Sequence, residues 1–424
     1  MVKAIEYFGS FIEKMTKNSP DKARKWLLFG YRLFGLKLKF FPDKRLPLAK
    51  QKSAVYLNKT VRSVFDDPEN VALVNVFMPC EILEAMGIVP MCAELFSAFI
   101  NGAYCERVFA DEAKKEGIAE TYCSYHKIFL GTAYTRLMRP PKTIINTSLV
   151  CDANNLTFRE LASQMDIPRY YIDVPSDRSE ESVRYVAGEL RELTKFLEDV
   201  TGKPLEEEKL KETVLRSKKS IEIFREILEK KRNYSLPSDV TSEMYEAYLT
   251  HNGLGTEMCY DYAKTFLQEF KGAKKFTGIK ILWLHLIPNW QKPILDLFNF
   301  NEECQIVTCD MNFDNLVEID PEKPYESMAR RLVYNSWNTG KSRVDRAIKM
   351  GKYLQVDGCV CFCQWGCKQT MGLSSLFKET FEEEGIPLLV LDGDGADRRN
   401  SSDGQVSTRL NAFIEMLKVR KNGK

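Results

Sequence analysis

The chain has 424 residues, which exceeds the usual size of one hydrophobic core and predicts two domains. Its 61 basic and 59 acidic side chains nearly cancel, so no long-range field favours nucleic acid or anionic lipid as a partner. No apolar run reaches the ~18 residues that a membrane span needs, and the amphipathic start does not resemble a signal peptide, so we expect a cytoplasmic protein.

Residues 1–65 combine aromatic and basic side chains in helical patterns, which Pro42 and Pro47 interrupt. This pattern predicts a helical N-terminal extension that packs on a core. From residue 66 onward, short apolar runs rich in β-branched residues alternate with helical stretches. The runs in this part are 71–78, 143–150 and 170–175. Such runs are typical of buried parallel strands.

Long charged helical patterns fill residues 178–232 and predict one or two linking helices. A second series of strands is predicted at 280–287, 305–311, 358–363 and 387–394. We therefore predict an α/β fold with two successive parallel-sheet domains, 66–235 and 236–424, and an active cleft between them.

Several of the twelve cysteines lie at the carboxyl ends of predicted strands, where open α/β sheets hold their ligands. These are Cys80, Cys151, Cys363 and Cys367. Alternation along the strand places Cys363 on one face with Cys359 and Cys361, so all three could be core thiols. Gly366 can form a turn that returns Cys367 toward Cys363, which makes this last pair the better candidate for binding a metal.

Three further cysteines, Cys92, Cys105 and Cys123, belong to helical stretches. Thr121 could cap a helix that begins near Cys123, and a helix N-terminus favours the thiolate that binds metal. For a single cysteine the simplest interpretation is a small buried hydrophobe. We keep that interpretation for Cys92, Cys259, Cys304, Cys309 and Cys359.

Several thiols that converge on one crevice indicate zinc or an iron–sulfur cluster. Structural zinc usually shows paired C-x-x-C knuckles, which this sequence lacks, and its three histidines are too few to favour a mixed Cys/His site. The spacing therefore favours an iron–sulfur cluster over zinc, with a chance grouping of buried thiols as the remaining alternative.

Five segments carry a resemblance to a known family. They are "PCEILEAMGIVP" (79–90), "YCSYHKIFLG" (122–131), "INTSLVCDANNLTFRELA" (145–162), "CFCQWGCKQTMG" (361–372) and "GIPLLVLDGDGADRRNSSDGQVSTRLNAFIEML" (385–417). In this order they resemble the 2-hydroxyacyl-CoA dehydratase and benzoyl-CoA reductase superfamily, over roughly residues 70–420. The resemblance implies that the two domains are flavodoxin-like (Rossmann-like).

The resemblance also implies an iron–sulfur cofactor between the domains. Members that dehydrate 2-hydroxyacyl-CoA hold one 4Fe-4S cubane through three cysteines, corresponding to Cys123, Cys151 and one cysteine of the 361–367 loop. The additional Cys80 and Cys105, with the pair Cys363 and Cys367, resemble the double-cubane branch, in which six cysteines hold an 8Fe-9S cluster.

This branch implies a homodimer that takes electrons from a separate ATP-hydrolysing iron–sulfur reductase and reduces small molecules. The chain itself has no G-x-x-x-x-G-K-[ST] phosphate loop, as that division of labour requires. The alternatives are a single-cubane dehydratase subunit, which is a lyase, and a non-catalytic metal scaffold or electron carrier.

Two other side chains are candidates for proton transfer. His126 lies one helical turn after Cys123 and could donate a proton or bond a sulfide, although it could equally be a packing histidine. Glu81 follows Cys80 and could relay protons, or it could stabilise the start of the next helix.

Overall fold

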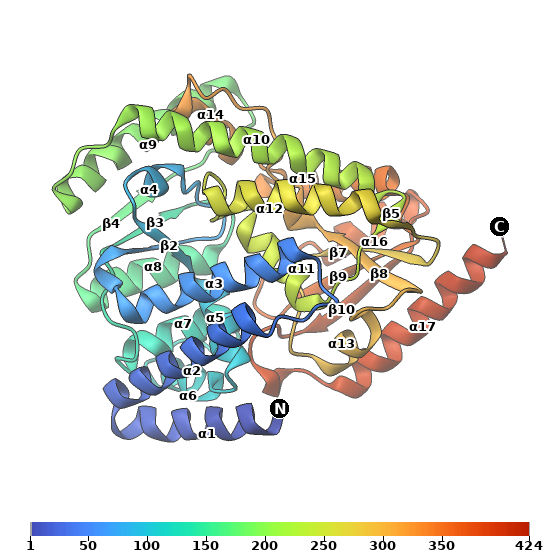
Figure 1. Cartoon of the computed structure of the whole chain (residues 1–424), viewed down its shortest axis with the longest axis horizontal. Helices are drawn as coiled ribbons and strands as arrows, with labels where there is room; N and C mark the ends of the chain where they lie inside the picture. Colours follow the sequence, from blue (N-terminus) through green and yellow to red (C-terminus); the bar gives the residue numbers. More distant parts are fainter. Residues whose placement is uncertain (1, 424) are drawn as a thin grey trace.

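The computed structural model describes residues 2–423, which begin with three helices. These are α1 (Val2–Asn18), α2 (Pro20–Phe40) and α3 (Leu48–Asp66), so the predicted helical extension is present, with its break around Pro42 and Pro47. Helices α1 and α2 lie along one side of the molecule, below the first sheet in Figure 1. Helix α3 lies deeper and contacts both halves of the chain.

The first sheet is parallel and has the strand order β2-β1-β3-β4. Its strands are β1 (Val71–Val74), β2 (Val89–Cys92), β3 (Thr143–Thr147) and β4 (Arg169–Ile172). Strand β2 was not predicted, because "VPMC" is short and contains a proline. As the edge strand, β2 tolerates Pro90, which has no N–H to donate. Cys92, placed in a helical stretch from the sequence, therefore ends a strand.

The second sheet is also parallel and has the order β10-β9-β7-β8. Its strands are β7 (Ile279–Leu284), β8 (Cys304–Cys309), β9 (Gly358–Gln364) and β10 (Leu388–Gly393). When the strands of each sheet are numbered from one in chain order, both sheets read 2-1-3-4, which is the flavodoxin-like order. The predicted fold of two flavodoxin-like domains is confirmed, while the exact boundaries at 65 and 235 stay a prediction.

Helices cover and connect the sheets. In the first half they are α4 (Glu81–Ala85), α5 (Ala93–Gly102), α6 (Glu106–Lys115), α7 (Ser124–Tyr134) and α8 (Asp152–Met165). The long helices α9 (Glu180–Thr201) and α10 (Glu207–Lys231) link the halves, as predicted. In the second half they are α11 (Val240–Leu249), α12 (Glu257–Glu269), α13 (Lys292–Phe298), α14 (Pro324–Val333), α15 (Gly340–Leu354), α16 (Ser374–Glu383) and α17 (Asp403–Asn422). A small antiparallel pair, β5 (Tyr234–Ser235) and β6 (Lys274–Lys275), follows α10.

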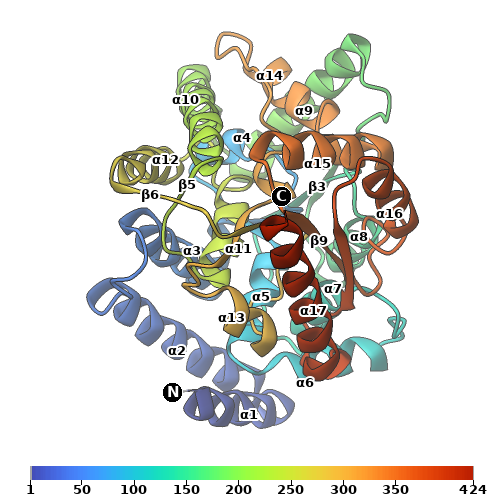
Figure 2. The same ribbon diagram turned by 90° about the vertical axis from the view of Figure 1, so that its right-hand side faces the viewer.

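Alternation along β9 divides the second core into two layers. Cys359, Cys361 and Cys363 pack among the side chains of α15 and α16, whereas Val360 and Phe362 belong to the other cluster, with α17. Figure 2 shows α15 and α16 on one side of β9 and α17 in front of it. The prediction that these three thiols share one face of the strand is confirmed.

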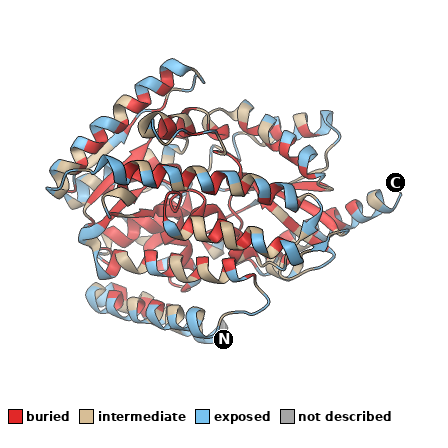
Figure 3. Cartoon of the chain, turned by 45° about the horizontal axis from the view of Figure 1, so that its top comes forward, coloured by how far each residue is buried: buried red, intermediate tan, exposed pale blue. Residues whose placement is uncertain are grey.

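Helix α3 ties the two halves together. It packs on α11 and α12, and the buried Lys50 forms an ion pair with Glu243. Its free N-terminal amides are also satisfied from the second half, because Glu269 accepts hydrogen bonds from the N–H groups of Leu48 (2.6 Å) and Ala49 (3.3 Å). Figure 3 shows the buried residues concentrated between the outer helices. Between residues 2 and 423, no helix combines the length and the apolar character required to span a bilayer.

Candidate functional site

The central strands of the two sheets direct their carboxyl ends at one cavity. Phe77 follows β1 and Cys151 follows β3, while His285 follows β7 and Cys367 follows β9, and all four line this cavity. In a 2-1-3-4 sheet, strands 1 and 3 flank the point where the strand order reverses, which is where such sheets bind ligands. The two domains therefore place their ligand-binding edges face to face.

Three of the six candidate cysteine ligands meet at this cavity: Cys123, Cys151 and Cys367. Cys123 and Cys151 are the N-cap residues of α7 and α8, and Cys367 lies in the turn after β9, where Gly366 has φ +76°. Cys123 is buried and the other two are half-buried. The thiols thus come from both domains.

Burial raises the pKa of all three thiols, and for Cys123 the neighbouring Cys151 and Cys367 raise it further. The metal-free thiols are therefore protonated at neutral pH. A metal that binds them has to displace the protons, with help from the positive N-terminal ends of α7 and α8.

The placement of the three thiols bears on the kind of metal group that they could hold. Among residues 2–423, no group of three His, Cys, Asp or Glu side chains is placed to hold one metal ion. A cubane offers a separate iron to each thiolate, so its ligands need not converge on a point. The cavity measures about 50 Å³, so a cluster would also require the lining side chains to move apart.

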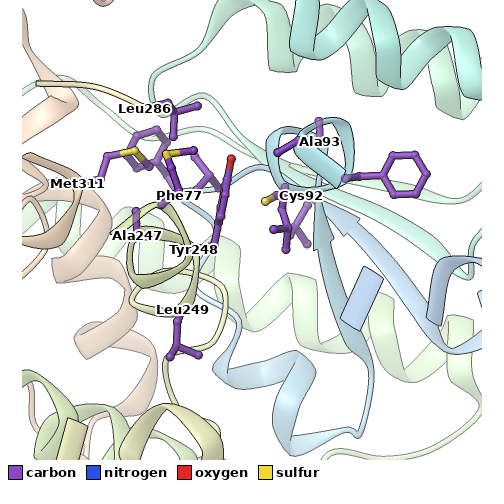
Figure 4. Close-up of a cluster of buried hydrophobic side chains, with 14 of the residues drawn as sticks. Phe77, Cys92, Ala93, Ala247, Tyr248, Leu249, Leu286 and Met311 are labelled. Atoms are coloured by element: carbon purple, nitrogen blue, oxygen red, sulfur yellow. The ribbon is translucent and has the colours of Figure 1, made fainter. Parts of the chain in front are cut away.

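Apolar side chains from both domains line part of the cavity. Phe77, Leu286 and Met311 line it, and Figure 4 shows these residues beside Ala247 and Tyr248 of α11. A wall of this kind keeps water from the thiols and lowers the local dielectric, which strengthens electrostatic interactions inside.

His126 lies at the cavity, as predicted for a residue one turn after Cys123. Its Nε2 is 3.8 Å from Cys151 Sγ and 3.8 Å from Glu94 Oε1. Burial lowers the pKa of His126 to about 3 and raises that of Glu94 to about 7. A neutral imidazole beside a carboxyl that is partly protonated near neutral pH can hold and pass a proton next to the thiols. The catalytic role of His126 stays a prediction.

His285 faces the cavity from the second domain and was not identified from the sequence. Its φ of +86° is unusual for a non-glycine residue, and its N–H donates to Asp310 Oδ1 (2.7 Å). The ring stacks on Trp337 with 5.6 Å between centroids, and Arg343 lies 3.3 Å from the same indole ring. Burial and the nearby Arg343 lower the pKa of His285, so its imidazole is neutral.

A signal for His285 was present in the sequence, because this histidine lies near the carboxyl end of the predicted strand 280–287. Glu94 gave no comparable signal. It follows β2, the strand that the pattern did not predict, so no sheet edge could be assigned to it.

The other three candidate ligands lie elsewhere. Cys80 Sγ donates to Met78 O (3.2 Å), and Cys105 Sγ lies 3.6 Å from Ile100 O. Cys363 packs into the core of the second sheet, next to Cys361. We expected six thiols to converge, and in the described chain three of them line the cavity. For Cys363 the reason is the two-residue period of β9, which turns its side chain away from the cavity. Which thiols bind iron stays a prediction.

Glu81, the second candidate for proton transfer, does not line the cavity. Its side chain is fully buried, pairs with Arg331 of α14 and accepts a hydrogen bond from Ser217 Oγ of α10 (2.7 Å). Glu81 is the first residue of α4, where the helix dipole favours a carboxylate. This position fits the alternative interpretation, in which Glu81 stabilises the start of the helix. The predicted cap from Thr121 is also not formed, since α7 shows no side-chain cap bond in the described chain.

The cysteines assigned to the core are all buried free thiols: Cys92, Cys259, Cys304, Cys309 and Cys359.

The turn after β10 owes its shape to Asp394, whose carboxylate accepts from the N–H groups of Ala396 (2.9 Å) and Asp397 (3.0 Å).

Comparison with known proteins agrees with this geometry. The family model described as "2-hydroxyglutaryl-CoA dehydratase, D-component" matches residues 75–417. Lactoyl-CoA dehydratase subunit alpha of Anaerotignum propionicum is 24% identical over 384 residues, covering 80% of this chain and 89% of that protein. The (R)-phenyllactyl-CoA dehydratase alpha subunit of Clostridium sporogenes is 23% identical over 368 residues, covering 81% and 89%. The chain therefore belongs to the 2-hydroxyglutaryl-CoA dehydratase D-component family.

Proposed function

We propose that this chain is the iron–sulfur subunit of a 2-hydroxyacyl-CoA dehydratase, with one 4Fe-4S cluster held by Cys123, Cys151 and Cys367. The observation that carries the proposal is the meeting of these three thiols, from both domains, at the carboxyl edges of the two sheets. When bound, such a cluster supplies one-electron chemistry. The three thiols would provide one cysteine ligand fewer than a cubane has irons.

The remaining residues of the cavity have roles that follow from their chemistry. His126 and Glu94 can hold a proton on the side of the first domain, next to Cys151, and a hydroxyl group that leaves as water requires such a proton. His285 presents a neutral imidazole from the second domain, and the apolar wall of Phe77, Leu286 and Met311 keeps bulk water out.

The relatives are named for lactoyl and phenyllactyl thioesters of coenzyme A, so we propose a 2-hydroxyacyl-CoA as the substrate class. Both are called alpha subunits, which supports a different second subunit rather than the homodimer implied by the double-cubane branch. Electrons would come from a separate ATP-hydrolysing iron–sulfur protein, since the chain has no phosphate loop of its own.

The double-cubane reductase remains a second candidate because Cys80, Cys105 and Cys363 are additional free thiols. It requires these thiols to reach the cluster, and none of them lines the cavity in this structure. Iron and acid-labile sulfide per chain, measured on protein purified without oxygen, separate the two. One cubane corresponds to about four irons and two fused cubanes to about eight.

Single cysteine substitutions separate the two candidates further. Cys151→Ser should lose most of the iron and the visible absorption of the cluster. Cys105→Ala is the matched control, since it removes a buried thiol that does not line the cavity, and it should keep both. Loss of iron from the Cys105 variant would favour the double cubane, while zinc in place of iron, or unchanged iron in Cys151→Ser, would contradict both candidates.

A further inference from the structure

Helix α2 carries an apolar stripe that faces solvent. Trp26, Phe29, Leu33, Leu36 and Phe40 recur at alternating spacings of three and four residues, and their side chains are 46–62% exposed. We call these five residues the α2 stripe. The opposite face of the helix already packs on the core, through Ala23, Leu27 and Tyr31 among others. Helix α2 therefore has two apolar faces, and the described chain covers one of them.

Aromatic side chains order one end of the stripe. Trp26 packs edge-on against Phe11 of α1, with ring centroids 5.7 Å apart, and edge-on against Phe29 at 5.8 Å. Rings held in this way lose little conformational entropy when a partner covers them, as in the anchor residues of protein interfaces. A contiguous exposed patch of this kind is rare on monomeric proteins that have no partner.

The charges beside the stripe indicate the nature of that partner. In a heptad that places the stripe at the a and d positions, the g positions are Lys25, Arg32 and Lys39, so all three are basic. Arg32 pairs with Asp66 of α3, whereas Lys25 has no ion pair within residues 2–423. A second copy of α2 would bring like charges together, while a helix with acidic flanks would complement them.

We propose that the α2 stripe docks an amphipathic helix of a partner protein, with an apolar seam against the stripe and Glu or Asp at its flanking positions. The alternating three-and-four spacing is that of a helix seam, which packs side chains between those of a facing helix. The stripe lies outside the region matched by the family model, which begins at residue 75. The proposal is therefore independent of the proposed catalytic function.

The test uses the full chain and two labelled synthetic peptides of four heptads with Leu at a and d. One has Glu at e and g, and the other has Lys. Fluorescence anisotropy should show binding of the acidic peptide and at least about tenfold weaker binding of the basic one. The double variant Lys25→Glu/Lys39→Glu should reverse this preference. Leu33→Asn/Leu36→Asn should abolish binding with an unchanged thermal midpoint, since both residues are exposed, and Leu215→Asn on α10 is the matched control.

Three outcomes would overturn the proposal. One is equal affinity for the two peptides, or none for the acidic one. Another is a dimer of the full chain, seen by light scattering, that dissociates in the Leu33→Asn/Leu36→Asn variant, because a second copy would then cover the stripe. The third is sedimentation with phosphatidylcholine–phosphatidylglycerol vesicles that the same variant loses, without peptide binding, because the stripe would then be a membrane surface.

Discussion

Replacing Glu81 by glutamine should destabilise the fold while leaving the cavity unchanged. The Glu81 and Arg331 side chains are 1% and 4% exposed, and the carboxylate joins α4 to α14 and α10. Glutamine retains the volume and can still accept from Ser217, but it leaves the Arg331 charge buried without compensation. Breaking such a pair costs about 3–5 kcal/mol, or roughly 6–10 °C in the first unfolding midpoint at about 2 °C per kcal/mol.

Differential scanning calorimetry of the wild type, the two single variants, the double variant and one control tests this reasoning. The double variant Glu81→Gln/Arg331→Met should lose less stability than the sum of the single variants, because removing both charges leaves neither uncompensated. Glu326→Gln is the control on α14, where Glu326 makes a 2.6 Å pair with Arg191 on the surface, and it should cost no more than about 1 kcal/mol. A Glu81→Gln protein with the midpoint of the wild type and no activity would refute the structural role and restore Glu81 as a proton relay.

Two further predictions concern packing and pH. Gly131→Ala should destabilise the protein by about 1–3 kcal/mol or more in a urea titration, because an added Cβ on α7 would lie 1.9 Å from Phe109 O of α6. Gly188→Ala on α9 is the control: its added Cβ meets open space, so the variant should be neutral or stabilising. His251 Nε2 lies 3.0 Å from Asp314 Oδ2, and although burial opposes the charge, Asp314 raises the pKa of His251. Its stabilisation is complete below the unfolded pKa of about 6.5 and is lost as pH rises through the higher folded value, so His251→Gln should cost most near pH 6 and less near pH 9. A cost that is independent of pH would contradict the charged pair.

The strands that the sequence predicted are those with an apolar run that is buried in the structure. Strand β9 reads "GCVCFC" and is buried along its whole length, so its pattern survives in the structure. Strand β2 reads "VPMC", and its place at the sheet edge follows from pairing with β1, which no local pattern encodes. Glu94 could not be identified from the sequence for the same reason, because its position depends on where β2 ends.

The choice between Cys363 and Cys367 shows a different limit. Strand alternation already grouped Cys363 with Cys359 and Cys361, on a face that the structure buries in the core, although we predicted that Cys363 binds metal together with Cys367. The turn at Gly366 then sets where Cys367 points, and its φ of +76° is a property of the folded chain. The opposing His285 depends on the approach of the two domains, which a single sequence does not specify.

The position of α3 has a consequence for synthesis on the ribosome. Its buried Lys50 pairs with Glu243, a residue 193 positions later in the chain. At 5–20 residues per second, α3 emerges roughly 10–40 s before the helices that cover it. During that interval the face of α3 that packs on α11 and α12 is open to the cell. The nascent chain therefore presents a binding site for chaperones early in translation, and this site closes only when α11 and α12 appear.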